Sequence, residues 1–140
     1  MSRGRKQVSA DAEAEYAADV ALAARFDELL ERARVTEQEF RTAQARAVPI
    51  AQLYPLATAL DTALTEVMRA AFAAERAEIG PRGYDDRIYR RKARAKPAVH
   101  AWSDEAERLL TLRETHRLTG IPPAPRTGLP AAGISSLPAA

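Results

Sequence analysis

The chain has 140 residues, a formal net charge of +2 and no cysteine, which excludes disulfides, thiolate metal sites and cysteine nucleophiles. Alanine supplies 31 residues, aromatic residues 6% and glycine only six positions, a composition that favours helix over sheet. We therefore expect one all-α domain whose alanine-rich helices bury little area each and gain stability by association.

The charge is distributed unevenly along the chain. Residues 1–9 carry +3 and residues 82–96 carry +5, which leaves −6 for the rest. Two basic islands on an acidic body predict local contacts with anions. We expect a basic N-terminal arm over residues 1–9, a helical domain over 10–119 and a proline-rich tail over 120–140. No long apolar run follows the basic start, so neither secretion nor membrane spanning is expected, and a cytosolic setting fits.

The first helix is predicted over residues 10–34. Ser9 or Asp11 can cap its N-terminus, acidic residues are concentrated near this end, and Arg32 and Arg34 lie near the other, as the helix dipole favours. Six apolar residues recur at three- and four-residue spacing and form the face expected in the core: Tyr16, Val20, Ala23, Phe26, Leu30 and Ala33.

A second helix is predicted to begin at Glu37. The segment Val35–Phe40 contains a capping box, with Thr36 as N-cap and Glu39 as its partner, inside a hydrophobic staple formed by its first and last residues. This combination is typical of a helix N-terminus, so we expect the chain to leave the first helix here.

The apolar spacing of this second helix continues through two prolines. Pro49 and Pro55 each remove a backbone donor, yet the periodicity persists as far as Ile79, just before Gly80. The pattern predicts one long kinked helix or two nearly collinear ones. Packed against the first helix, it would form a long helical hairpin, followed by shorter C-terminal helices.

Six of the ten residues from 87 to 96 are basic, after Asp85 and Asp86, which are suited to cap a helix. In a helix, arginines at three- and four-residue spacing form a row that can follow a phosphate backbone. The alternatives are a solvated helix or salt bridges between subunits. Together with the basic arm, the predicted DNA-binding residues are Arg3, Arg5, Lys6, Arg87, Arg90, Arg91, Lys92, Arg94 and Lys96.

A final helix is predicted over residues 104–118, with Ser103 as its N-cap and Gly120 as its stop. The twenty residues that follow contain five prolines and two glycines, which cannot continue a helix and offer little to bury. We expect this tail to dock a partner protein, through Ile121, Pro122, Pro123, Arg126 and Leu129.

The residue types needed for catalysis are not grouped in the sequence. His100 and His116 lie sixteen residues apart with no ligand at metal-binding spacing, and no phosphate-binding loop is present. No nucleophile, base and orienting group can be placed together. We therefore expect a protein that is not an enzyme and needs no metal or cofactor.

The order of these features resembles the terminase small subunits of tailed bacteriophages. The motifs that carry the resemblance are short and extend over nearly the whole chain: Arg3–Lys6, Val35–Glu39, Lys96–Val99 and Gly120–Arg126. The resemblance implies a closed homo-oligomeric ring in the host cytoplasm that binds double-stranded viral DNA. It also implies recruitment of the large terminase subunit, which carries the ATPase and nuclease.

Two other functions fit the same features. A virion head-associated structural adaptor could use the basic run against an acidic protein surface and thread the tail between neighbours. A small DNA-binding regulator would need a compact helix-turn-helix, which the long helix starting at Glu37 does not resemble.

Overall fold

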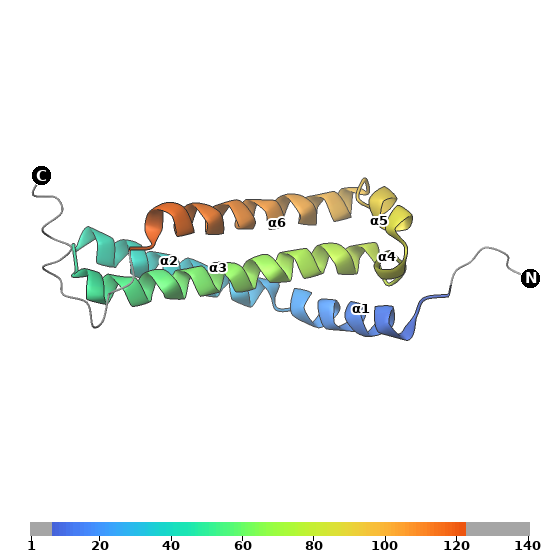
Figure 1. The fold of residues 1–140 in the computed structure, drawn as a ribbon, viewed down its shortest axis with the longest axis horizontal. Helices are drawn as coiled ribbons and strands as arrows, with labels where there is room; N and C mark the ends of the chain where they lie inside the picture. Colours follow the sequence, from blue (N-terminus) through green and yellow to red (C-terminus); the bar gives the residue numbers. More distant parts are fainter. Residues whose placement is uncertain (1–6, 123–140) are drawn as a thin grey trace, which may run out of the picture.

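The computed structural model describes residues 7–122, which contain helices and no strand (Figure 1). The elements in chain order are α1 (Ala10–Ala23), α2 (Phe26–Ala45), α3 (Ile50–Ile79), α4 (Arg82–Asp85), α5 (Arg87–Ala93), α6 (Pro97–Thr115) and a π-helical segment, η1 (His116–Gly120). Within this range no helix has both the length and the apolar character needed to cross a membrane.

The helices form an elongated bundle with α3 in the middle (Figure 1). α1 and α2 follow one another along one side of α3, and α2 runs antiparallel to it, with Arg32 of α2 paired to Glu66 of α3 at 3.2 Å. α6 lies along another side, also antiparallel to α3, and Arg117 beyond its C-terminus pairs with Asp61 at 2.6 Å. The hydrogen bonds from Arg117 hold the pKa of Asp61 below its usual value. α4 and α5 are short helices in the connection between the C-terminus of α3 and the N-terminus of α6.

Small side chains on α3 let its neighbours approach closely. The alanines Ala57, Ala70, Ala71 and Ala73 are fully buried, as is Val67. The larger core side chains come from both flanking helices and include Leu29, Phe40 and Leu109, each 1% exposed. Phe26 and Trp102 meet edge to face between α2 and α6, with ring centroids 5.0 Å apart. The core is therefore built on α3, where small side chains leave room for the larger side chains of α2 and α6.

The predicted helix boundary at Thr36 and Glu37 is wrong. α2 continues through the whole Val35–Phe40 segment, and the Thr36 hydroxyl donates to the Arg32 carbonyl at 2.6 Å, one turn back along the helix. Thr36 therefore bonds as a mid-helix residue and not as a cap. A cap contributes about 1 kcal/mol, whereas the unbroken helix buries Leu29, Ala33 and Phe40 on one face, so packing outweighs the local signal.

The breaks in this part of the chain occur at two other places. One separates α1 from α2 at Ala24 and Arg25, where the first helix was expected to continue. The other lies between Arg46 and Pro49, where the chain reverses direction and Ala47 has a φ of 52°. Residues 37–79 are therefore neither one kinked helix nor two collinear ones. α3 ends at Ile79, the residue predicted.

Two further details differ from the sequence-based expectations. α6 begins at Pro97, which suits the first position of a helix, so Ser103 lies inside the helix and donates its hydroxyl hydrogen to the Glu75 carboxylate. Val20, placed in the expected core face of the first helix, is 42% exposed. In both cases the neighbouring helix, which the sequence does not reveal, decides the environment of the side chain.

The two candidate caps should respond differently to substitution. Ser9 is a true N-cap, because its hydroxyl accepts a hydrogen bond from the Ala12 amide at 3.0 Å. We expect Ser9→Ala to lower the free energy of unfolding by about 1 kcal/mol. Thr36→Ala should change it by less than about 0.5 kcal/mol, because alanine is the better helix former at a mid-helix position. Urea denaturation followed by circular dichroism measures both, and a larger loss for Thr36→Ala would contradict the continuous α2.

Candidate nucleic-acid interface

α5 has an inward side and an outward side that differ in composition. Tyr89 and Ala93, four residues apart, pack against Ile79 at the end of α3 and Val99 at the start of α6. Asp86 caps the helix by accepting a hydrogen bond from the Tyr89 amide at 3.0 Å, as its place before the basic run suggested. α5 is thus held in a fixed orientation by the side that faces the bundle.

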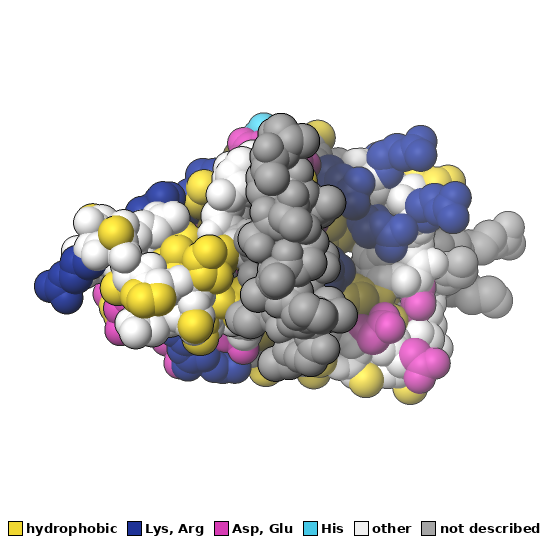
Figure 2. Space-filling view, turned by 60° about the vertical axis from the view of Figure 1, so that its left-hand side comes forward, with side chains coloured by type: hydrophobic (Ala, Val, Ile, Leu, Met, Phe, Trp, Pro, Cys, Tyr) yellow, Lys and Arg dark blue, Asp and Glu magenta, His cyan; other side chains and the backbone are white. Residues whose placement is uncertain are grey.

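The outward side of α5 and the residues after it are basic. Five of the predicted DNA-binding side chains are exposed and form no ion pair or side-chain hydrogen bond within residues 7–122: Arg87, Arg91, Lys92, Arg94 and Lys96. Figure 2 shows Lys and Arg side chains gathered at the upper right of the molecule, above a group of acidic ones. Ile88 lies within this face and is 68% exposed. We call these five basic residues the α5 basic face.

Arg90, also predicted to bind DNA, differs from the other residues of the run. Its side chain is half-buried, and Nη1 donates a hydrogen bond to the Gly83 carbonyl at 2.8 Å. This contact links α5 to α4. The row of arginines expected from sequence spacing is therefore divided, with Arg90 directed toward the protein and its neighbours toward solvent.

Two cations lie over the ring of Tyr89 at the edge of the α5 basic face. The guanidinium carbon of Arg82 is 4.5 Å from the ring centroid, and the ammonium nitrogen of Lys96 is 5.9 Å from it. Both distances are within cation–π range. Arg82 also pairs with Asp86 at 3.4 Å. The exposed side chain of Lys96, just before α6, therefore lies over an aromatic ring.

The chain enters the bundle beside this face. The Ser9 amide donates to the Asp85 carboxylate at 2.9 Å, so α1 begins at the end of the molecule that carries α4 and α5 (Figure 1). Arg3, Arg5 and Lys6 lie outside the described residues.

Only the first two of the predicted partner-docking residues lie in the described range. Ile121 is half-buried and packs against the main core, and Pro122 is also half-buried. Pro123, Arg126 and Leu129 lie outside the described residues. The start of the tail is therefore attached to the bundle at the end opposite to α5 (Figure 1).

The histidines occupy separate environments. The buried His116 has Nε2 2.8 Å from the Ala57 carbonyl, and its ring meets Phe40 edge to face at 5.2 Å. The exposed His100 lies 3.4 Å from Asp104. Among residues 7–122 no three metal-ligating side chains come together. His116 thus connects η1 to α2 and α3.

One polar cluster was missed by sequence reasoning. Arg76 of α3 and Tyr84 of α4 both donate hydrogen bonds to Asp19 of α1, although they lie 57 and 65 residues beyond it in the chain. No local spacing in the sequence signals such a contact.

No family model, curated protein or solved structure matches the chain.

Proposed function

We propose that this protein binds double-stranded DNA through the α5 basic face and acts as a non-enzymatic small terminase subunit in viral genome packaging. The proposed DNA contact is supported by one observation, the α5 basic face. Five exposed cations lie on α5 and the three residues after it, and the opposite side of α5 packs against the bundle. Solvated helix surfaces normally alternate positive and negative charges, and this one does not.

The chemistry of the face suits phosphate better than a neutral partner. Three of its five side chains are arginines, whose planar forks bind phosphate oxygens bidentately, and the two lysines add point charges. Contacts of this kind orient a protein on the duplex without reading its sequence. The proposed role is therefore attachment to the DNA backbone, with the basic arm containing Arg3, Arg5 and Lys6 as a second contact.

The packaging role rests on the resemblance to small terminases. In that role the bundle assembles into a ring-like homo-oligomer, and the tail after Gly120 recruits the large terminase subunit in the host cytoplasm. Native mass spectrometry should then give an oligomer, and the protein should be missing from purified particles. A protein retained in the particle would indicate the head-associated adaptor instead, and a monomer at micromolar concentration would contradict the ring.

DNA binding should depend steeply on salt. Each phosphate neutralised by a basic side chain releases counterions, so five contacts give a slope of log K against log salt of about −4 to −5. Fluorescence anisotropy of a labelled mixed-sequence duplex between about 50 and 200 mM salt measures this slope. A slope near zero would exclude phosphate contact as the mode of binding.

A further inference from the structure

α1 is attached to the bundle mainly by polar contacts. Ala12 is its only buried residue, and its contact with the main hydrophobic cluster is made by Leu22, which is half-buried and lies next to the C-terminal end of the helix. Its aromatic contact is edge to face, between Tyr16 and Tyr84, with centroids 6.4 Å apart. A break at Ala24 and Arg25 separates it from α2. Little apolar surface therefore opposes the release of α1, and the break provides a place for it to turn.

The main polar contact of α1 is the Asp19 carboxylate. Arg76 of α3 binds this carboxylate bidentately: Nε donates to Oδ2 at 2.7 Å and Nη2 donates to Oδ1 at 3.1 Å. The Tyr84 hydroxyl of α4 donates to the same carboxylate. Burial would raise the pKa of Asp19, but the hydrogen bonds from Arg76 and Tyr84 and the charge of Arg76 lower it overall. The group is therefore an anion at neutral pH.

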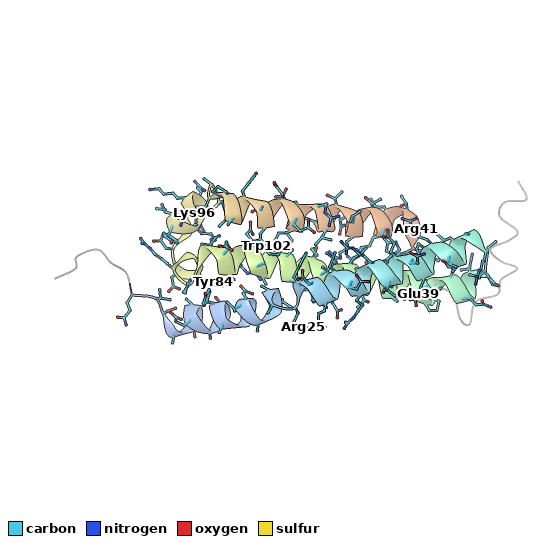
Figure 3. All side chains as sticks on the ribbon, turned by 180° about the vertical axis from the view of Figure 1, so that it is seen from behind. Arg25, Glu39, Arg41, Tyr84, Lys96 and Trp102 are labelled. Atoms are coloured by element: carbon cyan, nitrogen blue, oxygen red, sulfur yellow. The ribbon has the colours of Figure 1, made fainter. Side chains whose placement is uncertain are left out.

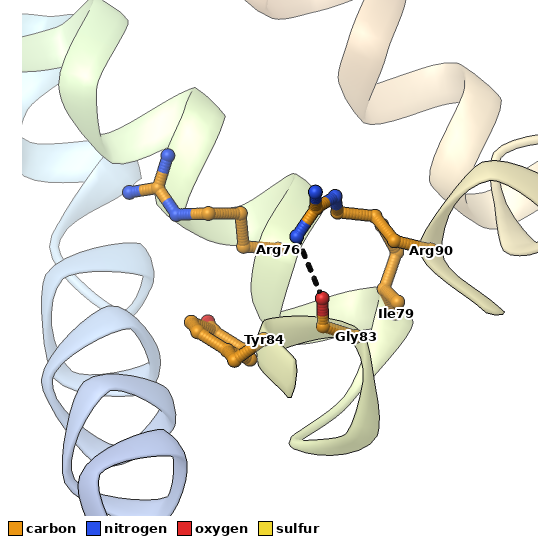
Figure 4. Close-up of a pocket in the computed structure, with 5 residues that line it drawn as sticks. All are labelled: Arg76, Ile79, Gly83, Tyr84 and Arg90. Atoms are coloured by element: carbon orange, nitrogen blue, oxygen red, sulfur yellow. Dashed lines mark hydrogen bonds between the residues drawn. The ribbon is translucent and has the colours of Figure 1, made fainter. Parts of the chain in front are cut away.

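A second arginine lies beside this contact. Arg90 reaches into the same region from α5, and Figure 4 shows Arg76 and Arg90 on either side of a small pocket next to Tyr84. A more open cleft next to it is lined by these three residues together with Glu15, Ala18 and Asp19 of α1. Arg90 donates one hydrogen bond, to Gly83, and forms no ion pair within residues 7–122. The cationic groups come from α3 and α5, whereas the anions that face them come from α1.

We propose that Arg76, Tyr84 and Arg90 form a second oxyanion site, which Asp19 occupies in this conformation and which a DNA backbone phosphate takes when α1 swings away. The fork that binds a carboxylate in two places also fits a phosphate, and the tyrosine hydroxyl can donate to either. Release of α1 also removes its acidic residues from the neighbourhood of the α5 basic face. The inference rests on the proposed DNA binding and adds that α1, in its docked position, weakens that binding.

The test compares two variants with the same charge change on the same helix. Asp19→Asn frees Arg76, whereas Glu13→Gln removes an exposed charge that has no ion pair or side-chain hydrogen bond within residues 7–122. In the anisotropy assay at low salt we expect Asp19→Asn to bind the duplex at least about threefold more tightly than Glu13→Gln. Its salt slope should be steeper by about 0.9, because one more phosphate is neutralised. Adding Arg76→Gln to Asp19→Asn should abolish both gains.

A charge-neutral variant separates release of α1 from electrostatics. Ser9→Ala removes the hydroxyl that caps α1 and bonds to Asp85, so it should also tighten DNA binding without changing the net charge. Circular dichroism verifies that each variant is folded. If Asp19→Asn does not fold, Ser9→Ala serves as the test in its place. Equal binding by Asp19→Asn and Glu13→Gln, or a gain that survives Arg76→Gln, would overturn the inference while leaving the α5 contact intact. Absence of DNA binding by every variant would overturn the proposed function as well.

Discussion

Replacing Arg87, Arg91 and Arg94 with glutamine is expected to weaken binding to double-stranded DNA by roughly a hundredfold at about 0.1 M salt. The salt slope should become shallower by about 2.7, since three phosphate contacts are lost. The three side chains are exposed and form no ion pair or side-chain hydrogen bond within residues 7–122, so their loss should leave the fold intact. Arg90 is kept in this variant because it supports the link between α5 and α4.

A matched triple variant distinguishes a local contact from a change in net charge. Arg34, Arg41 and Arg46 lie on or just after α2, toward the end of the bundle away from α5, and all three are exposed. Figure 3 shows Arg41 near this end and Lys96 near the other. Their replacement by glutamine removes the same charge, and the ion pairs it breaks are exposed ones of small energy. If both triple variants lose affinity equally, the α5 basic face is not the binding site.

Phe40→Ala is expected to lower the free energy of unfolding by about 3–5 kcal/mol. The ring is 1% exposed and packs edge to face on His116, so its removal leaves a cavity where α2, α3 and η1 meet. Domains of this size are stable by only about 5–15 kcal/mol, so the variant loses a large part of that margin. Urea denaturation monitored by circular dichroism gives the value.

Val35→Ala is the control for this core substitution. Val35 lies on the same helix five residues earlier, and it is 50% exposed. The sequence pattern paired the two residues in a hydrophobic staple, whereas in the continuous helix α2 their environments differ. We expect Val35→Ala to change stability by less than about 0.5 kcal/mol. If both variants lost a similar amount of stability, the difference in burial between Phe40 and Val35 would be contradicted.

Helix formation and several helix ends could be predicted from the sequence because local interactions decide them. Ser9 and Asp86 are N-caps that bond to amides three residues ahead, and α3 ends where Gly80 takes a φ of 100°. The buried side chains of α3 follow the apolar spacing read from the chain, as Leu60 and Val67 illustrate. In each case the determining contact lies within a few residues.

The candidate site was predictable only in part. The basic run identified the exposed cations of the α5 basic face, but its spacing did not distinguish Arg90, which bonds to Gly83 seven residues away. The cluster of Asp19, Arg76 and Tyr84 had no sequence signal, because its members come from three helices. Local patterns thus indicated the charge of the surface but not which arginines were already engaged.

By itself, then, the sequence determined the helical class, the caps at Ser9 and Asp86, the stop at Gly80 and the two basic islands, since propensity, capping and charge are properties of neighbouring residues. Only the tertiary structure decided where the helices break and which way they run. The capping signal at Thr36 was overridden because burial of Leu29, Ala33 and Phe40 against α3 stabilises a continuous α2 by more than one cap contributes. The same packing brings Ser9 and α1 to the end that carries α5, and so places Asp19 on Arg76 next to the α5 basic face.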